Sequence, residues 1–410
     1  MIVPFTQYYI LLMPSFVRRV VRCIKHWLIC HIVRRDKFVD EASSAMRKRI
    51  SNILYEEEVH LFNGTNLKES NRLYTNRVIE FNHVSCYGMS DIIRLDKNHY
   101  YYEVRNYYRK QKNDGISSKD YSTLLLDEKY YYLLKRYSQH QHVAEGILLS
   151  SYFANNYYHF TFQCIAKLRS CKHVPKHVPL LVHESIKKYA SFQKLIEICN
   201  VDKRDLIYMD EETQYDVDKL YYISPQMMSV PCYREGSVKT IDDDWYSKES
   251  ISYLREMILP HIDKEWDVPN YIFLERRFAS GRRSYNEEEC KELLQQYGFE
   301  AIRPETLSLE RQVALFNKAH CIVGATGGAY TNLVYGNENG TFVILKGARS
   351  TSSVWSAIVG FIGASLMYVL DASKGELTDA SQEHDSFHID VDELRGVVEG
   401  IIHKDKYDSI

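Results

Sequence analysis

Several features are missing from this sequence of 410 residues, and each absence excludes a class of protein. The formal net charge is only −2, from 52 Lys and Arg against 54 Asp and Glu, so no overall field favours nucleic acid. The nine cysteines include no Cys-x-x-Cys pair, which argues against a disulfide framework or a zinc ribbon. The most apolar run, residues 2–17, is interrupted by prolines and falls short of the ~20 residues of a membrane span. We therefore expect a globular protein in a reducing compartment, with no nucleic-acid partner.

The first forty residues stand apart because basic side chains are in excess there. Seven Lys or Arg face only two acidic residues, which gives this segment a charge of about +5. Val20, Ile24 and Trp27 recur at helical spacing, a pattern typical of a basic amphipathic helix at a membrane interface. A helix packed on the protein's own surface is the alternative. We expect residues 1–40 to be a membrane-surface segment of a cytoplasmic protein, peripheral on the inner face of the cell membrane.

Beyond this segment the sequence predicts two domains, residues 41–265 and 266–410. Residues 41–140 are rich in tyrosine, with short strands expected at Arg77–Phe81 and Tyr100–Val104. From Ala144 onward strands and helices alternate, as in a parallel sheet. The helices expected in this part are Asn155–Arg169, Ile186–Cys199 and Trp245–Ile262.

The clearest alternation is found in residues 271–347. Apolar runs of strand length occupy Tyr271–Leu274, Phe299–Ile302, Cys321–Gly324 and Phe342–Leu345. Asn286 and Ser308 stand where helix N-caps belong, and Gly298 follows the first of these helices. The pattern predicts half of a doubly wound α/β domain.

Two features of this stretch favour an anionic ligand at one edge of its sheet. The turn Ala325-Thr326-Gly327-Gly328 joins a buried strand to a helix, and a helix N-terminus presents unpaired backbone N–H groups. Four arginines follow the first strand, namely Arg276, Arg277, Arg282 and Arg283. Ligands of open α/β sheets bind at the carboxyl ends of the strands, where both features belong.

These motifs resemble glycosyltransferase family 61. The resemblance rests on Arg276, the pair Arg282-Arg283, Asn286-Glu287-Glu288, Gly298-Phe299, Gln312, Gly327 and Asn332, with Asn156-Tyr157-Tyr158-His159-Phe160 upstream. It implies an α/β protein with two Rossmann-like doubly wound domains facing a cleft, the glycosyltransferase B type, here with an N-terminal basic amphipathic helix. It also implies an inverting, metal-independent transfer without a cofactor. The expected donor is a nucleotide sugar, a UDP-sugar first of all, and the expected acceptor is a surface polysaccharide, another glycan or a lipid-linked glycan.

Three positions depart from the family pattern. This chain has Thr326 where relatives usually carry histidine, Gln163 where they carry an acidic residue, and Ile344 where they carry glutamate. The departures leave a second hypothesis open, a catalytically inactive nucleotide- or glycan-binding member of a polysaccharide assembly complex.

The candidate site residues divide into an acceptor set and a donor set. His159 is the candidate general base, because imidazole accepts a proton near neutral pH, and a packed structural histidine is the alternative. Asp210, Glu211 and Glu212 are a second source of a base. The donor-binding candidates are Arg276, Arg282, Arg283, Thr326, Gly327, Gly328 and Asn332. No metal site is expected, since Asp242-Asp243-Asp244 most simply caps the following helix.

Overall fold

The protein is described by a computed structural model. It describes residues 37–40, 42–63, 72–104, 116–117, 123–126, 132–134, 137–229, 232–233, 244–276, 284–347, 354–371, 373 and 385–408. The amphipathic helix expected in residues 1–40 falls outside these ranges, apart from the last few residues. Within the described part of the chain, no helix has the length and apolarity needed to cross a bilayer.

The carboxyl-terminal half contains a five-stranded, wholly parallel sheet in the order β17-β16-β18-β19-β20. Its strands are β16 (Tyr271–Leu274), β17 (Glu300–Ile302), β18 (Cys321–Ala325), β19 (Thr341–Lys346) and β20 (Ser365–Leu370). The four strands expected between residues 271 and 347 are thus confirmed. Apolar runs such as Ile322 and Val323 are fully buried because helices cover both faces of the sheet.

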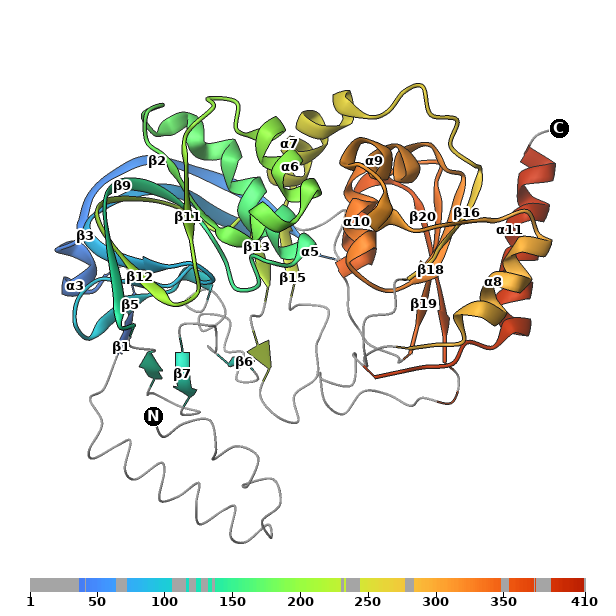
Figure 1. Ribbon diagram of the computed structural model, residues 1–410, viewed down its shortest axis with the longest axis horizontal. Coiled ribbons are helices and arrows are strands. Elements are labelled where there is room, and N and C mark those ends of the chain that lie inside the picture. Colours follow the sequence, from blue (N-terminus) through green and yellow to red (C-terminus); the bar gives the residue numbers. More distant parts are fainter. Residues whose placement is uncertain are drawn as a thin grey trace, which may run out of the picture.

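The helices of this half lie on both faces of the sheet (Figure 1). On one face are α8 (Glu287–Gln296) and α11 (Val391–Asp408), and on the other are α9 (Leu309–Lys318), the 3₁₀ helix η7 (Gly328–Tyr335) and α10 (Val354–Ile362), with the short η6 (Pro304–Thr306) nearby. Ser308 caps α9 by accepting a hydrogen bond from the Arg311 N–H, as expected. Gly298 ends α8 with a φ of 80°, a conformation that favours glycine. This half is therefore doubly wound.

The amino-terminal half is built on a mixed sheet of eleven strands. Its main strands are β2 (Ile50–Phe62), β3 (Arg72–Tyr87), β9 (Gln139–Leu149), β10 (Leu180–His183), β11 (Leu206–Met209) and β12 (Thr213–Ile223). The pairs β2–β3 and β3–β12 are antiparallel, whereas β12, β9, β10 and β11 are parallel to one another. A second Rossmann-like sheet was expected here, and the long antiparallel strands correct that expectation.

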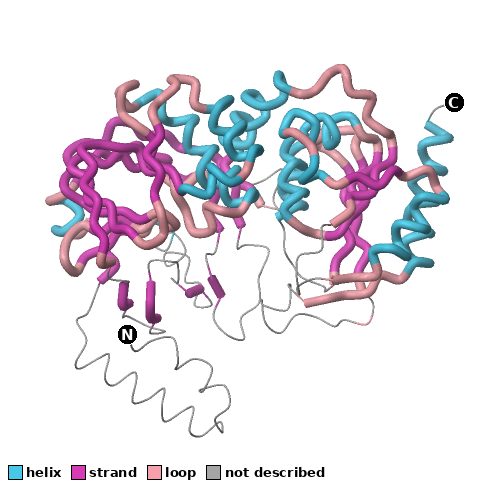
Figure 2. The backbone as a smooth tube through the Cα atoms, in the orientation of Figure 1, coloured by secondary structure: helices cyan, strands magenta, loops and turns pink. Residues whose placement is uncertain are grey.

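This mixed sheet curves strongly, so that the ends of strands that are not neighbours in the sheet come together (Figure 2). Gly88, directly after β3, lies so close to the end of β11 that a Cβ atom there would be 2.2 Å from the Asp210 carbonyl oxygen. The Ser150 hydroxyl, directly after β9, donates to the Gly88 carbonyl at 2.5 Å. The short strands of this half are β1 (Lys37–Val39), β4 (Ile93–Arg94), β5 (His99–Tyr101), β13 (Met227–Ser229) and β15 (Asp244–Ser247) in the same sheet, and β6 (Ile116–Ser117), β7 (Thr123–Leu126), β8 (Tyr132–Leu134) and β14 (Cys232–Tyr233) in small ribbons.

The helices of this half differ from prediction in three places. The helix expected over Ile186–Cys199 is interrupted at Tyr189, which has an extended backbone conformation. The single helix expected over Asn155–Arg169 consists of α5 (Tyr157–His159), a π-helical turn η1 (Phe160–Cys164) and a 3₁₀ helix η2 (Ile165–His173). The helix expected from Trp245 begins at Lys248, because Asp244 and Trp245 belong to β15 and Ser247 provides the N-cap. The remaining helices are α3 (Ser44–Arg47), η3 (Glu184–Lys188), α6 (Ala190–Cys199), α7 (Lys248–Ile258) and η5 (Leu259–His261).

The two halves share one continuous hydrophobic cluster. It joins Phe160 and Phe192 of the amino-terminal half to Leu333 and Tyr335 of the carboxyl-terminal half. In Figure 1 the helices α5, α6 and α7 lie between the mixed sheet and the helices α9 and α10. The Arg255 guanidinium of α7 donates to the carbonyl oxygen of Val334 at 2.7 Å, across the same boundary. A shared middle layer of helices therefore holds the two sheets together.

Candidate active site

The predicted donor side is brought together at the carboxyl ends of β16 and β18. Arg276 follows β16, and its Nη2 atom would lie 3.6 Å from a Cβ atom built on Gly327, which follows β18. Nothing lies within 4 Å of a Cβ atom built on Gly328. The backbone of Gly327 is extended, with a φ of 168°, so a left-handed conformation is not what glycine provides here. Its missing side chain leaves room beside the Arg276 guanidinium.

The neighbours of Arg276 hold it at this edge of the sheet, while the adjacent Glu275 has other partners. The Glu275 carboxylate pairs with Lys291 at 2.6 Å and with Arg303 at 3.0 Å. The Arg276 backbone N–H donates to the Glu287 carboxylate at 2.5 Å, which anchors the residue to the start of α8. Burial lowers the pKa of the Arg276 guanidinium, although arginine remains charged at any physiological pH. A half-buried cation at this edge is suited to a negatively charged ligand.

The Thr326 hydroxyl has a partner in the turn itself. It accepts a hydrogen bond from the Trp355 indole N–H at 3.2 Å, while the Thr326 backbone N–H donates to the Leu345 carbonyl at 2.9 Å. The turn is thereby tied both to α10, which carries Trp355, and to β19. Thr326 thus orders the turn through hydrogen bonds.

Asn332 lies in η7 with its side chain completely buried. Its Oδ1 atom accepts from the Tyr157 hydroxyl at 2.9 Å, and its Nδ2 atom donates to Gln312 at 3.2 Å. Neither contact is made within η7 itself. The amide joins the two halves of the protein, because Tyr157 belongs to α5 and Gln312 to α9.

Aromatic contacts connect the donor side to His159. The Tyr158 ring lies 5.7 Å from the Trp355 ring and 5.2 Å from the His159 ring, and both contacts are edge-on. Trp355 in turn donates to Thr326. His159 therefore lies two aromatic contacts away from the glycine-rich turn, although the two are far apart in the sequence.

His159 stands at the junction of α5 and the π-helical turn. Its Nδ1 atom is 3.1 Å from Gln163 Oε1, and because that oxygen only accepts, this contact requires the tautomer with the proton on Nδ1. The ring also packs against Phe153, whose φ of 63° is a strained conformation for a bulky residue. Strain of this kind is typical of functional sites.

The carboxylates considered as alternative bases have other partners. Burial alone would raise the pKa of Asp210, but hydrogen bonds from the Glu212 backbone N–H and from Thr213 lower it overall. Glu211 Oε1 lies 3.5 Å from His183 Nε2. Asp210 is therefore part of the turn that begins β12, and it is not among the described residues that line the cavity beside His159.

Two residues of this arrangement escaped sequence reasoning. Trp355 was not recognised because no motif surrounds it. Asp91 lines the same small cavity as His159 and Gln163, yet it comes from a part of the sequence with no chemical motif. The only local signal is the tight Gly88-Met89-Ser90 turn that precedes it. Of the other candidates, Arg282 and Arg283, like Arg277, lie outside the described residues.

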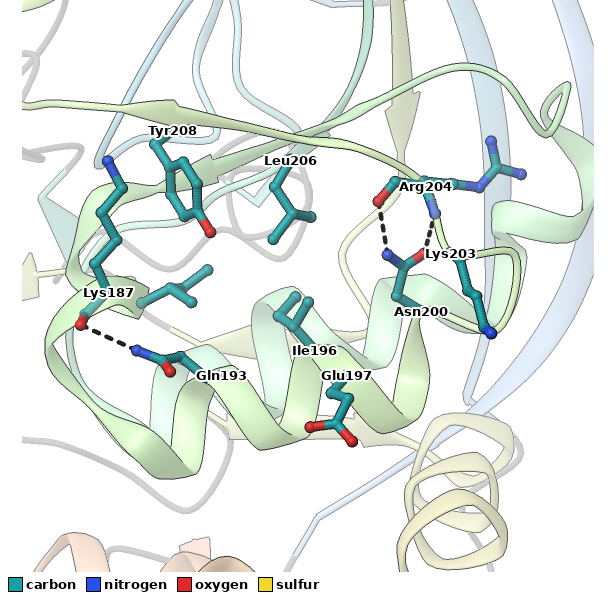
Figure 3. Close-up of a pocket in the computed structure, with 10 residues that line it drawn as sticks. Lys187, Gln193, Ile196, Glu197, Asn200, Lys203, Arg204, Leu206 and Tyr208 are labelled. Carbon is teal, nitrogen blue, oxygen red and sulfur yellow. Dashed lines mark hydrogen bonds between the residues drawn. The ribbon is translucent and has the colours of Figure 1, made fainter.

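A larger groove of about 580 Å³ lies over α6 and β11 (Figure 3). Its lining includes Lys187, whose ammonium lies 4.1 Å from the centre of the Tyr208 ring, and Arg204. The Arg204 guanidinium is turned inward and donates to buried carbonyl groups such as that of Val174 at 2.8 Å. None of the predicted site residues lines this groove, so its size alone does not make it the active site.

No curated protein sequence matches the chain. Residues 157–344 match the model of the family described as Glycosyltransferase 61. The match begins at Tyr157, two residues before His159, and ends at Ile344, which is fully buried in the core of β19. These residues form a glycosyltransferase family 61 domain.

Proposed function

We propose that this protein is an inverting, metal-independent glycosyltransferase that uses a nucleotide sugar, a UDP-sugar first of all, and acts on a surface polysaccharide or another glycan, free or lipid-linked. The observation that carries the proposal is the position of Arg276 next to the open turn at Gly327, at the carboxyl edge of a doubly wound sheet. The route of contacts through Trp355 to His159 supports an acceptor side next to it. A donor half and an acceptor half on two sheets would resemble the glycosyltransferase B arrangement, with a mixed sheet in place of one of its two Rossmann-like sheets.

In this proposal the donor side stabilises the leaving group. The acceptor hydroxyl loses its proton to a base on the acceptor side, and its oxygen attacks the anomeric carbon of the sugar. The bond from that carbon to the diphosphate breaks, and its electron pair leaves with the nucleoside diphosphate. Arg276 and the first N–H groups of η7 supply positive charge where the diphosphate gains negative charge. A fixed guanidinium can supply the charge that a metal ion supplies in other transferases.

The test is release of nucleoside diphosphate from a panel of nucleotide sugars in the presence of EDTA, with methyl glycosides as acceptors. We expect release from one donor, and a fall in kcat/KM of about 100-fold or more in Arg276→Ala. Arg303→Ala is the matched control, because Arg303 lies at the end of the neighbouring strand β17 and pairs with Glu275. Equal activity in Arg276→Ala and Arg303→Ala would contradict the proposal.

A non-catalytic binding protein is the second candidate, motivated by the neutral residues Gln163, Thr326 and Ile344 at three positions of the family pattern. Tight binding of a nucleotide without release of diphosphate from any donor in the panel would favour this candidate. Family membership favours the enzyme.

The same proposal places the protein at the inner face of the cell membrane through residues 1–40. The motivation is the basic, amphipathic pattern of that segment, which suits an anionic lipid surface. Deletion of residues 1–35 is expected to move the protein from the membrane fraction to the soluble fraction at moderate salt. Unchanged membrane association after the deletion would rule out this role.

A further inference from the structure

The cavity beside His159 is small and has room for about one oxygen atom of a ligand. Its volume is about 10 Å³, which is close to the minimum for a single water molecule. It is lined by Asp91, Tyr102, Val104, Tyr152, His159, Gln163 and Ser229. The lining comes from segments that are far apart in the sequence, so the cavity depends on the fold of the whole amino-terminal half.

Asp91 brings a carboxylate into this cavity that is almost completely buried. Its exposed fraction is 6%, and its Oδ1 atom has no hydrogen-bond partner among the described residues. An unpaired buried oxygen costs free energy of the order of 1–3 kcal/mol, more if it is charged. Such a cost is usually offset by function or by a bound ligand. A hydroxyl group that entered the cavity would be the missing partner.

The backbone around Asp91 is held firmly in place. The preceding Gly88 is packed directly against the Asp210 carbonyl and accepts a hydrogen bond from Ser150. The Ser90 hydroxyl accepts from the Ile92 N–H at 3.0 Å and closes a tight turn around Asp91. Three strand ends, those of β3, β9 and β11, therefore fix the position of this one side chain. A base that must meet a substrate at a set distance requires such a rigid support.

The charges around Asp91 favour a strong base. Burial raises the pKa of the Asp91 carboxyl, and the nearby Lys167 ammonium, which donates to the Ser150 carbonyl at 3.2 Å, lowers it only in part. The other ionisable groups that face the cavity are the His159 imidazole and the phenols of Tyr102 and Tyr152. A carboxylate with a raised pKa takes a proton more readily than an ordinary one.

Gln163, which contacts His159, cannot act as the base. The Gln163 side chain is hydrogen-bonded to His159 Nδ1, and an amide neither takes up a proton nor carries a negative charge at physiological pH. Asp91 is the carboxyl group among the residues that line this cavity.

We propose that Asp91 is the general base of the transfer reaction, which receives the proton of the acceptor hydroxyl in the cavity beside His159. This inference rests on the proposed function. Asp91 Oδ1 takes the proton as the acceptor oxygen bonds to the anomeric carbon and the diphosphate leaves with its electron pair. The proton then passes from the neutral carboxyl to water. His159, held by Gln163, borders the same hydroxyl and orients it.

The experiment uses the full chain and the donor identified by the panel above, and compares four forms of the enzyme. These are the wild type, Asp91→Asn, the double variant Asp91→Asn with Gln163→Glu, and Glu103→Gln. Glu103 is a matched control because it is buried and lies in the sequence between Tyr102 and Val104, which line the cavity. Its own carboxylate accepts a hydrogen bond from the Tyr74 hydroxyl and another from the Ser224 hydroxyl at 3.0 Å. Three quantities are measured for each form: kcat as a function of pH, the affinity for UDP by calorimetry, and Tm.

We expect kcat of Asp91→Asn to fall by about 100-fold or more, with the affinity for UDP unchanged. The activity of the wild type should be lost as pH falls and Asp91 takes up a proton, and Asp91→Asn should lack this acid limb. The double variant should regain about tenfold in kcat, because Gln163→Glu returns a carboxylate to the cavity. Glu103→Gln should keep its kcat within about threefold.

Three results would overturn the assignment. The first is a kcat of Asp91→Asn within about threefold of the wild type, which would leave the proposed function intact. The second is a loss of kcat that accompanies a large fall in Tm, or that Glu103→Gln shares, since either would mark a structural role. The third is the absence of diphosphate release from every donor by the wild type, which would overturn the proposed function as well.

Discussion

The two sheets of this protein illustrate two ways of presenting side chains to a ligand. The five-stranded sheet has regular strand-helix connections, and Arg276 and Gly327 meet at its carboxyl edge as they would in many α/β proteins. The mixed sheet gathers His159, Gln163 and Asp91 only because it curves until the ends of β3, β9 and β11 touch. The donor side thus depends on local connections, and the acceptor side depends on long-range packing. Substitutions should therefore affect the two sides differently.

The largest difference is expected from adding one methyl group on each side. Gly88→Ala would place a Cβ atom 2.2 Å from the backbone oxygen of Asp210, so the loop that carries Asp91 must shift. We expect a loss of about 3 kcal/mol in the free energy of unfolding and a large loss of activity. Gly328→Ala meets nothing within 4 Å and should change stability by less than about 0.5 kcal/mol. Denaturant unfolding of both variants checks this contrast, and equal losses would contradict it.

A smaller difference in the free energy of unfolding is expected between variants of two carboxylates, each of which connects a helix to a strand. Glu57 of β2 accepts two hydrogen bonds from Arg169 of η2 and one from Asn76 at 2.8 Å. Burial alone would raise the pKa of Glu57, yet these contacts lower it from 4.5 to about 2. On the donor side, Glu275 pairs with Lys291, which lowers the pKa of Glu275, but the cations there are more exposed. Glu57→Gln should therefore cost ~2 kcal/mol of unfolding free energy, and Glu275→Gln less than about 1 kcal/mol.

The contribution of Glu57 to the free energy of unfolding depends on pH in a definite direction. Because the pKa of Glu57 is lower in the folded state, its contribution is fully present above about pH 5 and is lost as pH falls toward 2. Urea unfolding at pH 7 and pH 3 should show a smaller difference between the wild type and Glu57→Gln at the lower pH. A difference that grows on acidification would contradict the role of this pair.

The same contrast explains what could be predicted from the sequence. The strands β16, β18 and β19 were located within a residue or two, because short apolar runs between helices encode them locally. The antiparallel strands β2 and β3 are 13 and 16 residues long and have irregular burial patterns, so of the two only the part Arg77–Phe81 of β3 was predicted. The break in the helix after His159 also escaped prediction, since its π-helical turn contains neither glycine nor proline.

The candidate site divides in the same way. Arg276 and Gly327 could be paired from the sequence, because parallel strands bring their carboxyl ends to one edge. Asn332 could not be assigned, since its partners Tyr157 and Gln312 lie on two other helices. Asp91 could not be found at all, because its proximity to His159 is set by the curvature of an eleven-stranded sheet.

The most direct test of the division of the site into a donor side and an acceptor side is to measure by calorimetry how UDP binds to Arg276→Ala and to Asp91→Asn. The account predicts that Arg276→Ala weakens binding by ~2 kcal/mol, or about thirtyfold, because a charged hydrogen-bond donor to the phosphates is lost. It predicts that Asp91→Asn binds UDP within about twofold of the wild type. Equal weakening in both variants, or unchanged binding in Arg276→Ala, would contradict the division of the site into a donor and an acceptor side.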